Sequence, residues 1–323
     1  MSMKIAERRA VLGQLIAKRP GIETWTVHFD GQQGEAVVYT DLVGPVAEGD
    51  QVLLNTTAVD LQLGTGGQHF VINRIDLGST VPPMAISRDE GHIMKLRYTP
   101  LQLRVRAAEE DASPYHDLLR TAETLPGTPV VCLGLHSQLA PVVGGIKAAN
   151  PDLRIAYVMT DSAALPLAYS QLVHTLRESG LLDVTVSTGQ AFGGDLEAVN
   201  IFSALVTASL VGKADIIVAG QGPGNVGTAT ALGFGGIEQS ILLNAAAALD
   251  GLPVVVPRIS FADPRDRHRG LSHHSATVLR KLTMAEVVLP LPAMTPEQSD
   301  LILGQINQHG LVRHRLLTVD GKP

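Results

Sequence analysis

The chain has 323 residues, which suggests roughly two domains at about 150 residues each. Hydrophobic residues make up 45% and charged residues 17%, a composition that excludes disorder and permits a large buried core. The net charge of −6 argues against a general nucleic-acid binder, and the single cysteine, Cys132, excludes an internal disulfide and a cysteine-rich zinc site. We expect a cytoplasmic protein with neither nucleic-acid nor membrane partners, because the sequence shows no signal peptide and no run of about 18 apolar residues.

The first eighty residues predict short strands that are separated by glycine turns. Residues 22–29 and 35–40 flank the turn Asp30-Gly31-Gln32-Gln33-Gly34, which is typical of a β-hairpin. Further strands are predicted at residues 51–55 and 69–75. This pattern over about eighty residues fits a small barrel of roughly five or six strands, of the OB or SH3 type.

A connector follows the predicted barrel domain. Pro82 and Pro83 close the N-terminal domain, residues 1–83, and residues 84–127 show no clean helical or strand period. Its first part, residues 88–106, is locally positive, with five lysines and arginines against two acidic residues. It is either a solvated linker or a segment that adds positive groups to a cleft at the domain junction.

Residues 128–323 predict a different architecture, in which apolar runs alternate with helical segments. Strands that are apolar throughout are buried on both faces, as in a parallel sheet covered by helices. Seven such strands and six helices predict a doubly wound, mostly parallel, Rossmann-like α/β domain. The predicted strands are residues 129–135, 154–160, 183–188, 214–219, 253–259, 286–291 and 315–319. The predicted helices are residues 138–149, 163–179, 196–211, 226–249, 273–282 and 296–308.

The loops of this domain differ between the two edges of the predicted sheet. Those that leave strands, at residues 187–195, 220–227 and 260–269, are rich in glycine and in reactive side chains, whereas the loops that enter strands are ordinary. Ligands of such sheets bind beyond the carboxyl ends of the strands. We therefore expect a site at that edge. The alternative is that these glycines only reflect the usual composition of βα loops.

The segment 220–227 has the spacing G-x-G-x-G-x-x-G, follows a predicted strand and opens a predicted helix. Glycines let the backbone approach an anion, and a helix N-terminus offers unpaired N–H groups. Two features weaken a dinucleotide interpretation: Pro223 removes one N–H, and the acidic residue expected about 20 residues later is missing. Close packing of the helix on the sheet is the alternative. The residues predicted to bind a ligand here are Gly220, Gly222, Gly224 and Asn225.

A second candidate element, residues 263–275, carries three arginines within five residues. Guanidinium groups bind phosphates and carboxylates, so we predict that these arginines clamp an anion. The alternative is a solvated loop in which they pair with Asp263 and Asp266. In an enzyme, Asp263 or His268 would act as the acid or base, and Ser272 is predicted to cap the following helix. The predicted ligand-binding arginines are Arg265, Arg267 and Arg269.

Two further interpretations of these residues are weaker. His273 and His274 are neighbours that would point about 100° apart on a helix, whereas a chelating pair is spaced by three or four residues, so we expect no metal site. His268 with Asp263 and Asp266 remains an alternative site for a divalent ion.

Ser137, Asp263 and His268 occur in the chain order of an α/β-hydrolase triad. The elbow G-x-S-x-G that this class of enzyme needs is missing, because the local sequence is His136-Ser137-Gln138-Leu139. Ser137 is therefore predicted to cap a helix. Cys132 lies inside a predicted buried strand and is expected to be a core residue.

Several strings of the sequence resemble a bacterial family that is catalogued as a domain of unknown function. They are GDQVLLNTTAV at 49–59, LGTGGQHFV at 63–71, GHIMKLRYTP at 91–100 and GQGPGN at 220–225. The similarity extends along nearly the whole chain. The resemblance implies a bacterial cytoplasmic protein of this size, and it implies neither an activity nor site residues.

The residues themselves favour the binding of a small anionic ligand, of phosphate or nucleotide type, at the carboxyl edge of the α/β sheet. The enzyme version of this hypothesis is phosphoryl or acyl-phosphate chemistry on that ligand. The alternatives are a ligand-sensing or protein-interaction module without catalysis, and a hydrolase that uses Ser137, Asp263 and His268. The identity of any cofactor is left open, and a homo-oligomer is one of the assemblies left open.

Overall fold

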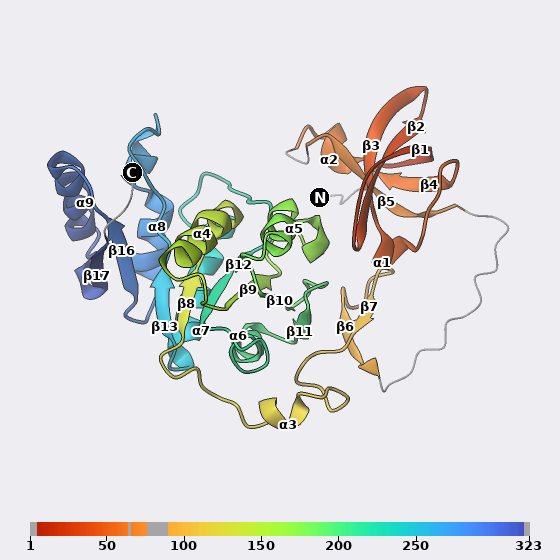
Figure 1. The fold of residues 1–323 in the computed structure, drawn as a ribbon. Helices are drawn as coiled ribbons and strands as arrows, with labels where there is room; N and C mark the ends of the chain where they lie inside the picture. The colour runs from red at the N-terminus through yellow and green to blue at the C-terminus, as the bar shows by residue number, and fades with distance from the viewer. Residues whose placement is uncertain (1–4, 64–65, 76–89, 320–323) are drawn as a thin grey trace. The chain divides into compact units, whose positions relative to one another are not determined.

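The computed structural model describes residues 5–63, 66–75 and 90–319 and divides the chain into two compact units, Met1–Ile86 and Ser87–Pro323 (Figure 1). The boundary predicted at Pro82 and Pro83 lies outside the described residues. None of the helices formed by the described residues has the length and apolar character needed to cross a bilayer.

The first unit is a closed barrel with the strand order β1-β2-β3-β5-β4. Its strands are β1 (Glu7–Arg19), β2 (Ile22–Phe29), β3 (Gln32–Tyr39), β4 (Gln51–Asn55) and β5 (Gln68–Arg74), and its one-turn helices are α1 (Thr40–Val43) and α2 (Thr57–Asp60). β3 pairs with β5 in parallel and the other neighbours are antiparallel. The predicted barrel is confirmed, and this strand order is that of the OB type.

The sequence pattern did not reveal β1, the longest strand of the barrel. Its register against β2 shifts between Leu12 and Leu15 and again between Leu15 and Ala17. Such irregularities interrupt the alternation of buried and exposed residues on which a prediction of strands depends. In the regular strand β2, by contrast, Trp25 and Val27 alternate into the barrel core.

The second unit contains a sheet of eight parallel strands in the order β11-β10-β9-β12-β8-β13-β16-β17. Its strands are β8 (Pro129–Cys132), β9 (Ile155–Thr160), β10 (Val184–Thr188), β11 (Leu196–Ala198), β12 (Ile216–Gln221), β13 (Leu252–Val255), β16 (Val288–Pro292) and β17 (Arg315–Val319). Every residue of β9 and β10 is buried, as expected for central strands covered on both faces. The predicted α/β class is confirmed.

Helices cover both faces of this sheet (Figure 1). Their bounds are α4 (Leu139–Ala149), α5 (Gln171–Glu178), α6 (Ile201–Leu210), α7 (Gln239–Ala248), α8 (His273–Thr277) and α9 (Pro296–Gln308). α4 and α5 share one hydrophobic core, and α6, α7, α8 and α9 share the other. Along β9, Ala156 and Val158 face the second core, while Tyr157 and Met159 face the first.

Three predicted helices begin later than expected. The predicted helix at residues 196–211 is instead β11 followed by α6, because the side chain of Asn200 accepts hydrogen bonds from the N–H groups of Phe202 and Ser203 and so starts the helix. α5 begins after Ser170, which caps it in the same way. The predicted helix at residues 226–249 begins only at Gln239, after the 3-10 turn Gly235–Glu238.

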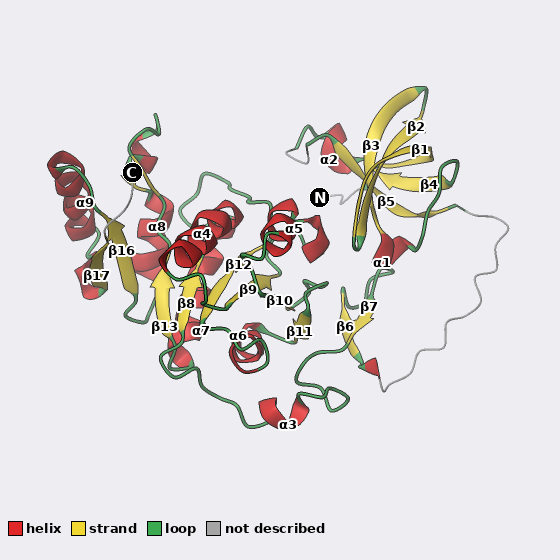
Figure 2. Cartoon of the chain, viewed as in Figure 1, coloured by secondary structure: helices red, strands yellow, loops and turns green. Residues whose placement is uncertain are grey.

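The described part of the predicted connector, from residue 90 onward, folds onto the edge of the α/β sheet (Figure 2). It forms the hairpin of β6 (Ile93–Lys95) and β7 (Leu103–Val105) and the one-turn helix α3 (His116–Leu119). The side chain of Lys95 is fully buried, and its Nζ lies 3.3 Å from Glu197 Oε2 and 3.1 Å from the carbonyl oxygen of Ala198. Lys95 therefore attaches the β6–β7 hairpin to β11.

We predict that Lys95→Ala lowers the free energy of unfolding by about 3–5 kcal/mol, because it leaves the buried carboxylate of Glu197 without its cation. Urea unfolding of the full chain measures the loss. Lys281→Ala, at an exposed lysine, is the matched control and should cost less than about 0.5 kcal/mol. Equal losses in the two variants would contradict the anchoring role.

Candidate functional site

The topology of the sheet creates a crevice between the carboxyl ends of β8 and β12. The connection from β8 runs through α4 on one face of the sheet, and the connection from β12 runs through α7 on the other. Neighbouring strands whose connections diverge in this way mark the usual ligand position of an open α/β sheet. The loops that leave β12 and β13 share this edge, since all strands of the sheet are parallel.

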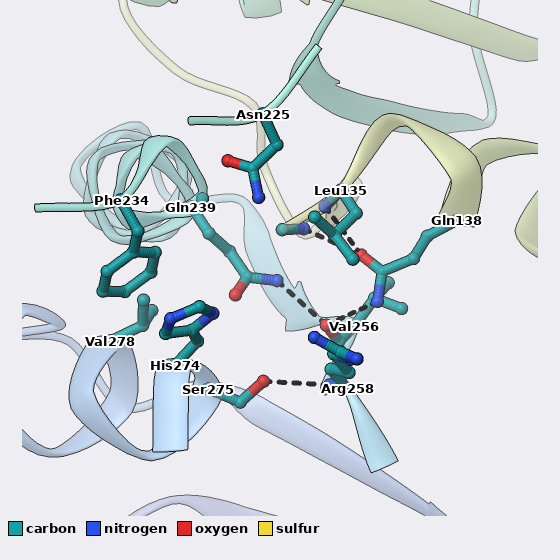
Figure 3. A pocket seen from close by; sticks show the side chains of 12 residues that line it. Leu135, Gln138, Asn225, Phe234, Gln239, Val256, Arg258, His274, Ser275 and Val278 are labelled. Atoms are coloured by element: carbon teal, nitrogen blue, oxygen red, sulfur yellow. Dashed lines mark hydrogen bonds between the residues drawn. The ribbon is translucent and has the colours of Figure 1, made fainter. Parts of the chain in front are cut away.

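A cavity with about 340 Å³ of open space lies at this crevice (Figure 3). It is lined by Gly134, Leu135, Gln138, Asn225, Phe234, Gly236, Gln239, Val256, Arg258, His274, Ser275 and Val278. These residues come from the segments after β8, β12 and β13, from the start of α7, and from α8 and the turn that follows it. The cavity therefore gathers chain segments that are distant in sequence at one point of the carboxyl edge.

One glycine lets two walls of the cavity lie close together. A Cβ atom on Gly236 would lie 2.7 Å from the carbonyl oxygen of Gly134, closer than any side chain allows. The loop after β8 and the turn before α7 can approach only because this position is glycine.

Two glutamine side chains hold the same segments in place. Gln138 Oε1 accepts hydrogen bonds from the backbone N–H groups of Gly134 and Leu135, at 2.9 and 3.0 Å. Gln239 Nε2 donates to the carbonyl oxygens of Cys132 and Val256, at 2.7 and 3.0 Å. These amides satisfy buried backbone groups at the ends of β8 and β13, so they support the cavity as scaffold.

Arg258 supplies the charge of the cavity wall. Its Nη2 lies 3.0 Å from Asp263 Oδ2, and its backbone N–H donates to Ser275 Oγ, which fixes the residue beside the cavity. Among the twelve described residues that line the cavity, none is a carboxylate. The polar side of the cavity is completed by Asn225, which points inward in Figure 3. Of the ligand-binding residues predicted from the sequence, Asn225 is the one that lines this cavity.

The arginine-rich loop, residues 261–269, connects two short antiparallel strands, β14 (Ile259–Ser260) and β15 (Gly270–Leu271). Arg265 is half-exposed and binds Asp263 with two hydrogen bonds, Nε to Oδ1 and Nη2 to Oδ2, both 2.9 Å. The hydrogen bonds from Arg265 hold the pKa of Asp263 well below its usual range. Asp263 is therefore a permanent anion between two guanidinium groups, which leaves it poorly suited to act as a general acid or base.

Arg267 and Arg269 are exposed. Within the described residues, neither side chain makes a hydrogen bond or ion pair, and neither residue lines the cavity. Their predicted role in binding an anion stays a prediction.

The glycine segment does not open a helix, contrary to the expectation from its spacing. Gly220 lies within β12, and a Cβ atom there would meet the side chain of Leu133 at 2.8 Å. At Gly222 a Cβ atom would lie 2.6 Å from the carbonyl oxygen of Ala164, and Gly224 has a φ of 103°. The first two glycines thus allow close packing, which was the alternative interpretation, while the chain remains irregular up to the turn at Gly235.

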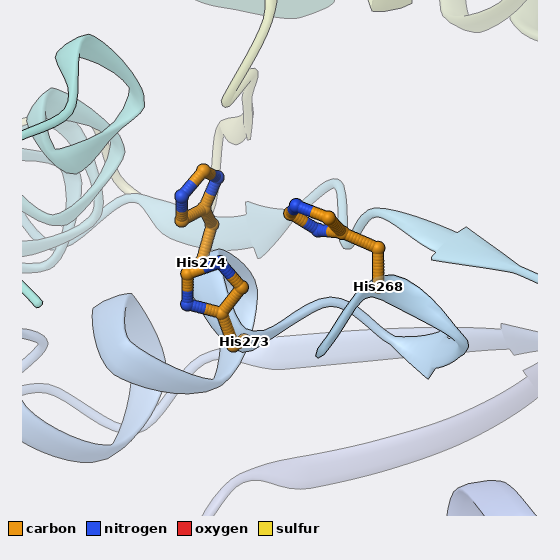
Figure 4. A group of neighbouring side chains, drawn as sticks. All are labelled: His268, His273 and His274. Atoms are coloured by element: carbon orange, nitrogen blue, oxygen red, sulfur yellow. The ribbon is translucent and has the colours of Figure 1, made fainter. Parts of the chain in front are cut away.

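The three histidines of the arginine-rich segment meet beside the cavity (Figure 4). The ring centroids are 4.8 Å apart for His268 and His273, 5.2 Å for His268 and His274, and 4.1 Å for His273 and His274. The expectation that neighbouring histidines diverge is wrong here, because both begin α8, directly after its N-cap, and their rings turn toward the same side. Ser272 is the predicted cap, and its Oγ accepts from the N–H of His274.

Burial and nearby positive charge keep these imidazoles neutral. Desolvation is the largest cause that lowers the pKa of His268 and of His273, and nearby arginines lower both further. Desolvation and the other two histidines lower the pKa of His274 to about 4. The His274 ring also stacks on Phe234, with centroids 4.0 Å apart. At neutral pH the cluster therefore offers nitrogen lone pairs in place of positive charge.

The hydrolase triad is not assembled. Ser137 lies in a 3-10 turn, His136–Gln138, where its side chain caps no helix, contrary to expectation. His268 Nδ1 is hydrogen-bonded to Ser272 Oγ at 2.8 Å. Among the residues that the structure describes, no hydrogen bond joins Ser137 to His268 or Asp263.

A further polar cluster next to the site was not recognised from the sequence. Glu238 accepts hydrogen bonds from Thr160 Oγ1, at 2.6 Å, and from Ser162 Oγ, and its burial raises the pKa of the carboxyl group. The cluster joins the loop after β9 to the turn before α7. Its members carried no motif, because Glu238 was expected inside a long helix.

Arg258 was also missed, since a single arginine at the end of a predicted strand forms no pattern. The signal available was its position, because it directly follows an apolar run that ends at the carboxyl edge of the sheet. The histidine cluster had a signal in the string Gly270-Leu271-Ser272-His273-His274, which lacks the helical spacing of a chelating pair.

The protein therefore has two units, of which the first is an OB-type barrel. The larger unit belongs to the Rossmann-like α/β class, and its cavity lies where the connections from β8 and β12 diverge. The family to which the chain belongs is described as a protein of unknown function (DUF3866), and its model matches residues 35–323. This confirms the resemblance seen in the sequence. A search of the curated proteins found no match.

We predict that Gly222→Ala lowers the free energy of unfolding by about 1–3 kcal/mol, because the added Cβ collides with the carbonyl oxygen of Ala164. Gly227→Ala, in the same segment but with open space around its Cβ, is the control and should change stability by less than about 0.5 kcal/mol. Chemical denaturation of both variants measures the difference. If Gly222→Ala proves as mild as Gly227→Ala, close packing does not explain the glycine.

Proposed function

We propose that this protein binds a small anionic ligand, of phosphate or nucleotide type, in the cavity between the carboxyl ends of β8 and β12. The observation that carries the proposal is the guanidinium group of Arg258, which lines a cavity with no carboxylate among its described lining residues. A guanidinium in such surroundings is a preferred partner of phosphate and carboxylate groups.

The other walls suit the uncharged part of the same ligand. Leu135, Phe234, Val256 and Val278 give the cavity an apolar side, and Asn225 offers both a hydrogen-bond donor and an acceptor. The cavity opens to solvent, and its open space of about 340 Å³ includes part of that opening. A compact ligand with one charged group and one apolar or planar face fits this composition.

Binding is supported more strongly than acid–base catalysis by the groups around the cavity. Asp263 is held as a carboxylate by its hydrogen bonds from Arg265 and also pairs with Arg258, and His268 is buried and hydrogen-bonded to Ser272. Neither of the two predicted catalytic residues lines the cavity. This arrangement favours a ligand-binding or ligand-sensing role without proton transfer by these two residues.

The test is a thermal unfolding measurement on the full chain, kept free of metal by chelation, with phosphate, sulfate or a nucleoside monophosphate. At ten times the dissociation constant a ligand adds about 1.4 kcal/mol by mass action, which we expect to raise Tm by about 2–4 °C. Arg258→Gln should remove most of this rise, because it removes the charge in the cavity wall.

Two control variants separate Arg258 from the arginine-rich loop. Arg269→Gln, at an exposed arginine outside the cavity, should leave the rise unchanged. The double variant Arg265→Ala and Arg267→Ala removes the clamp predicted from the sequence. If the double variant loses the rise while Arg258→Gln keeps it, the ligand binds on the loop. If no anion shifts Tm at low ionic strength, the proposal is wrong.

The bacterial origin and cytoplasmic location, the absence of nucleic-acid and membrane partners, and homo-oligomer formation stay predictions from the sequence. They agree with the proposed binding of a small metabolite-sized ligand but do not contribute to the argument for it.

A further inference from the structure

The cluster of His268, His273 and His274 lies directly beside the proposed ligand cavity, and His274 belongs to both (Figure 4). Each of the three residues offers a ring nitrogen, and these nitrogens all lie within 4.8 Å of one another. The proposed function makes no use of His268 or His273.

We propose that His268, His273 and His274 bind one borderline transition-metal cation, of which Zn²⁺ is the representative. Three imidazole nitrogens favour Zn²⁺, Co²⁺ or Ni²⁺, whereas Mg²⁺ and Ca²⁺ require oxygen ligands. Three protein ligands also leave one coordination position for water or for another ligand.

The distances between the rings suit such an ion. A point equidistant from three atoms that are 4.8 Å apart lies about 2.8 Å from each, compared with roughly 2.0–2.1 Å for a Zn–N bond. Each nitrogen has to move inward by less than about 1 Å to reach bonding distance. Rotation of the side chains supplies a movement of this size without a change in the backbone.

The hydrogen bonds of the cluster also point to a missing partner. Ser272 Oγ, fully buried, lies 2.8 Å from His268 Nδ1, which leaves His268 Nε2 as the free ring nitrogen. Metal-binding histidines are commonly oriented by such a hydrogen bond from their second nitrogen. His273 Nε2 is buried and has no hydrogen-bond partner among the described residues. A buried nitrogen without a partner is uncommon, and a metal ion satisfies it.

The surrounding charges determine what completes the coordination. Arg258, Arg265 and Arg267 act on the cluster, and the carboxylate that acts on His268, Asp263, is already bound to Arg258 and Arg265. A divalent cation in this positive environment is favoured when its open position holds an anion, such as hydroxide or the anionic group of a ligand. The metal and the cavity would then share one anionic ligand.

The experiment uses the tag-free full chain after chelation and buffer exchange. Titration with Zn²⁺ is followed by calorimetry, and titration with Co²⁺ by the visible absorption of the bound ion. We expect one equivalent of either ion to bind, and a large excess of Mg²⁺ to leave the binding unchanged. His273→Gln and His274→Gln should each weaken binding by at least about 100-fold, since loss of a ligand exceeds the 10–100-fold effect of a supporting residue.

His28→Gln, at an exposed histidine of β2, is the matched control and should bind as the unaltered chain does. His268 is buried, so His268→Gln is compared by circular dichroism first, and His273→Gln carries the conclusion if His268→Gln does not fold. The proposal is overturned if the unaltered chain binds neither ion, or if the histidine variants bind as tightly as the control. Either failure leaves the anion proposal intact, because the test of Arg258 is made without metal.

Discussion

The position of β12 between β8 and β9 is the constraint on which the rest of the α/β unit depends. Because of it, the connections from β8 and β12 leave toward opposite faces of the sheet, and a crevice opens between two adjacent carboxyl ends. Gly236 then lets the two departing segments approach closely, because a Cβ atom there would collide with the carbonyl oxygen of Gly134. The cavity lies where these connections diverge, and Arg258 and His274 of the histidine cluster line it.

The positive charge around this edge is partly neutralised within the protein. One carboxylate, Asp263, binds both Arg258 and Arg265, so two of the guanidinium groups near the site share a single counterion. This sharing leaves a positive excess that a ligand can neutralise. The site combines the guanidinium group of Arg258 with the uncharged imidazoles of the histidine cluster. An anion large enough to contact both groups suits this arrangement.

A helix, strand or site could be predicted from the sequence where neighbouring residues alone determine it. α9 was predicted to the residue, because Thr295, Pro296 and Gln298 form a complete start signal. That the loops leaving the strands share one edge of the sheet could also be predicted, because the carboxyl ends of parallel strands all lie at the same edge. The start of α7 was not predicted, since tertiary packing at Gly236 sets where the helix begins. The histidine cluster was not predicted for a related reason. Helical spacing tests only residues within one helix, whereas His268 comes from the loop before α8.

The burial of Lys95 against Glu197 has a consequence for where this protein can be divided. The segment from residue 90 to 110 covers the outer edge of β11, with Ala107 bridging to Glu197 and the N–H of Ala108 donating to the carbonyl oxygen of Glu197. A truncated chain beginning at Thr128 would keep every strand of the large sheet yet expose an unpaired edge and a carboxylate stripped of its cation. Open edges of this kind recruit other strands, so such a fragment would be prone to aggregate, although its sequence holds the whole doubly wound pattern.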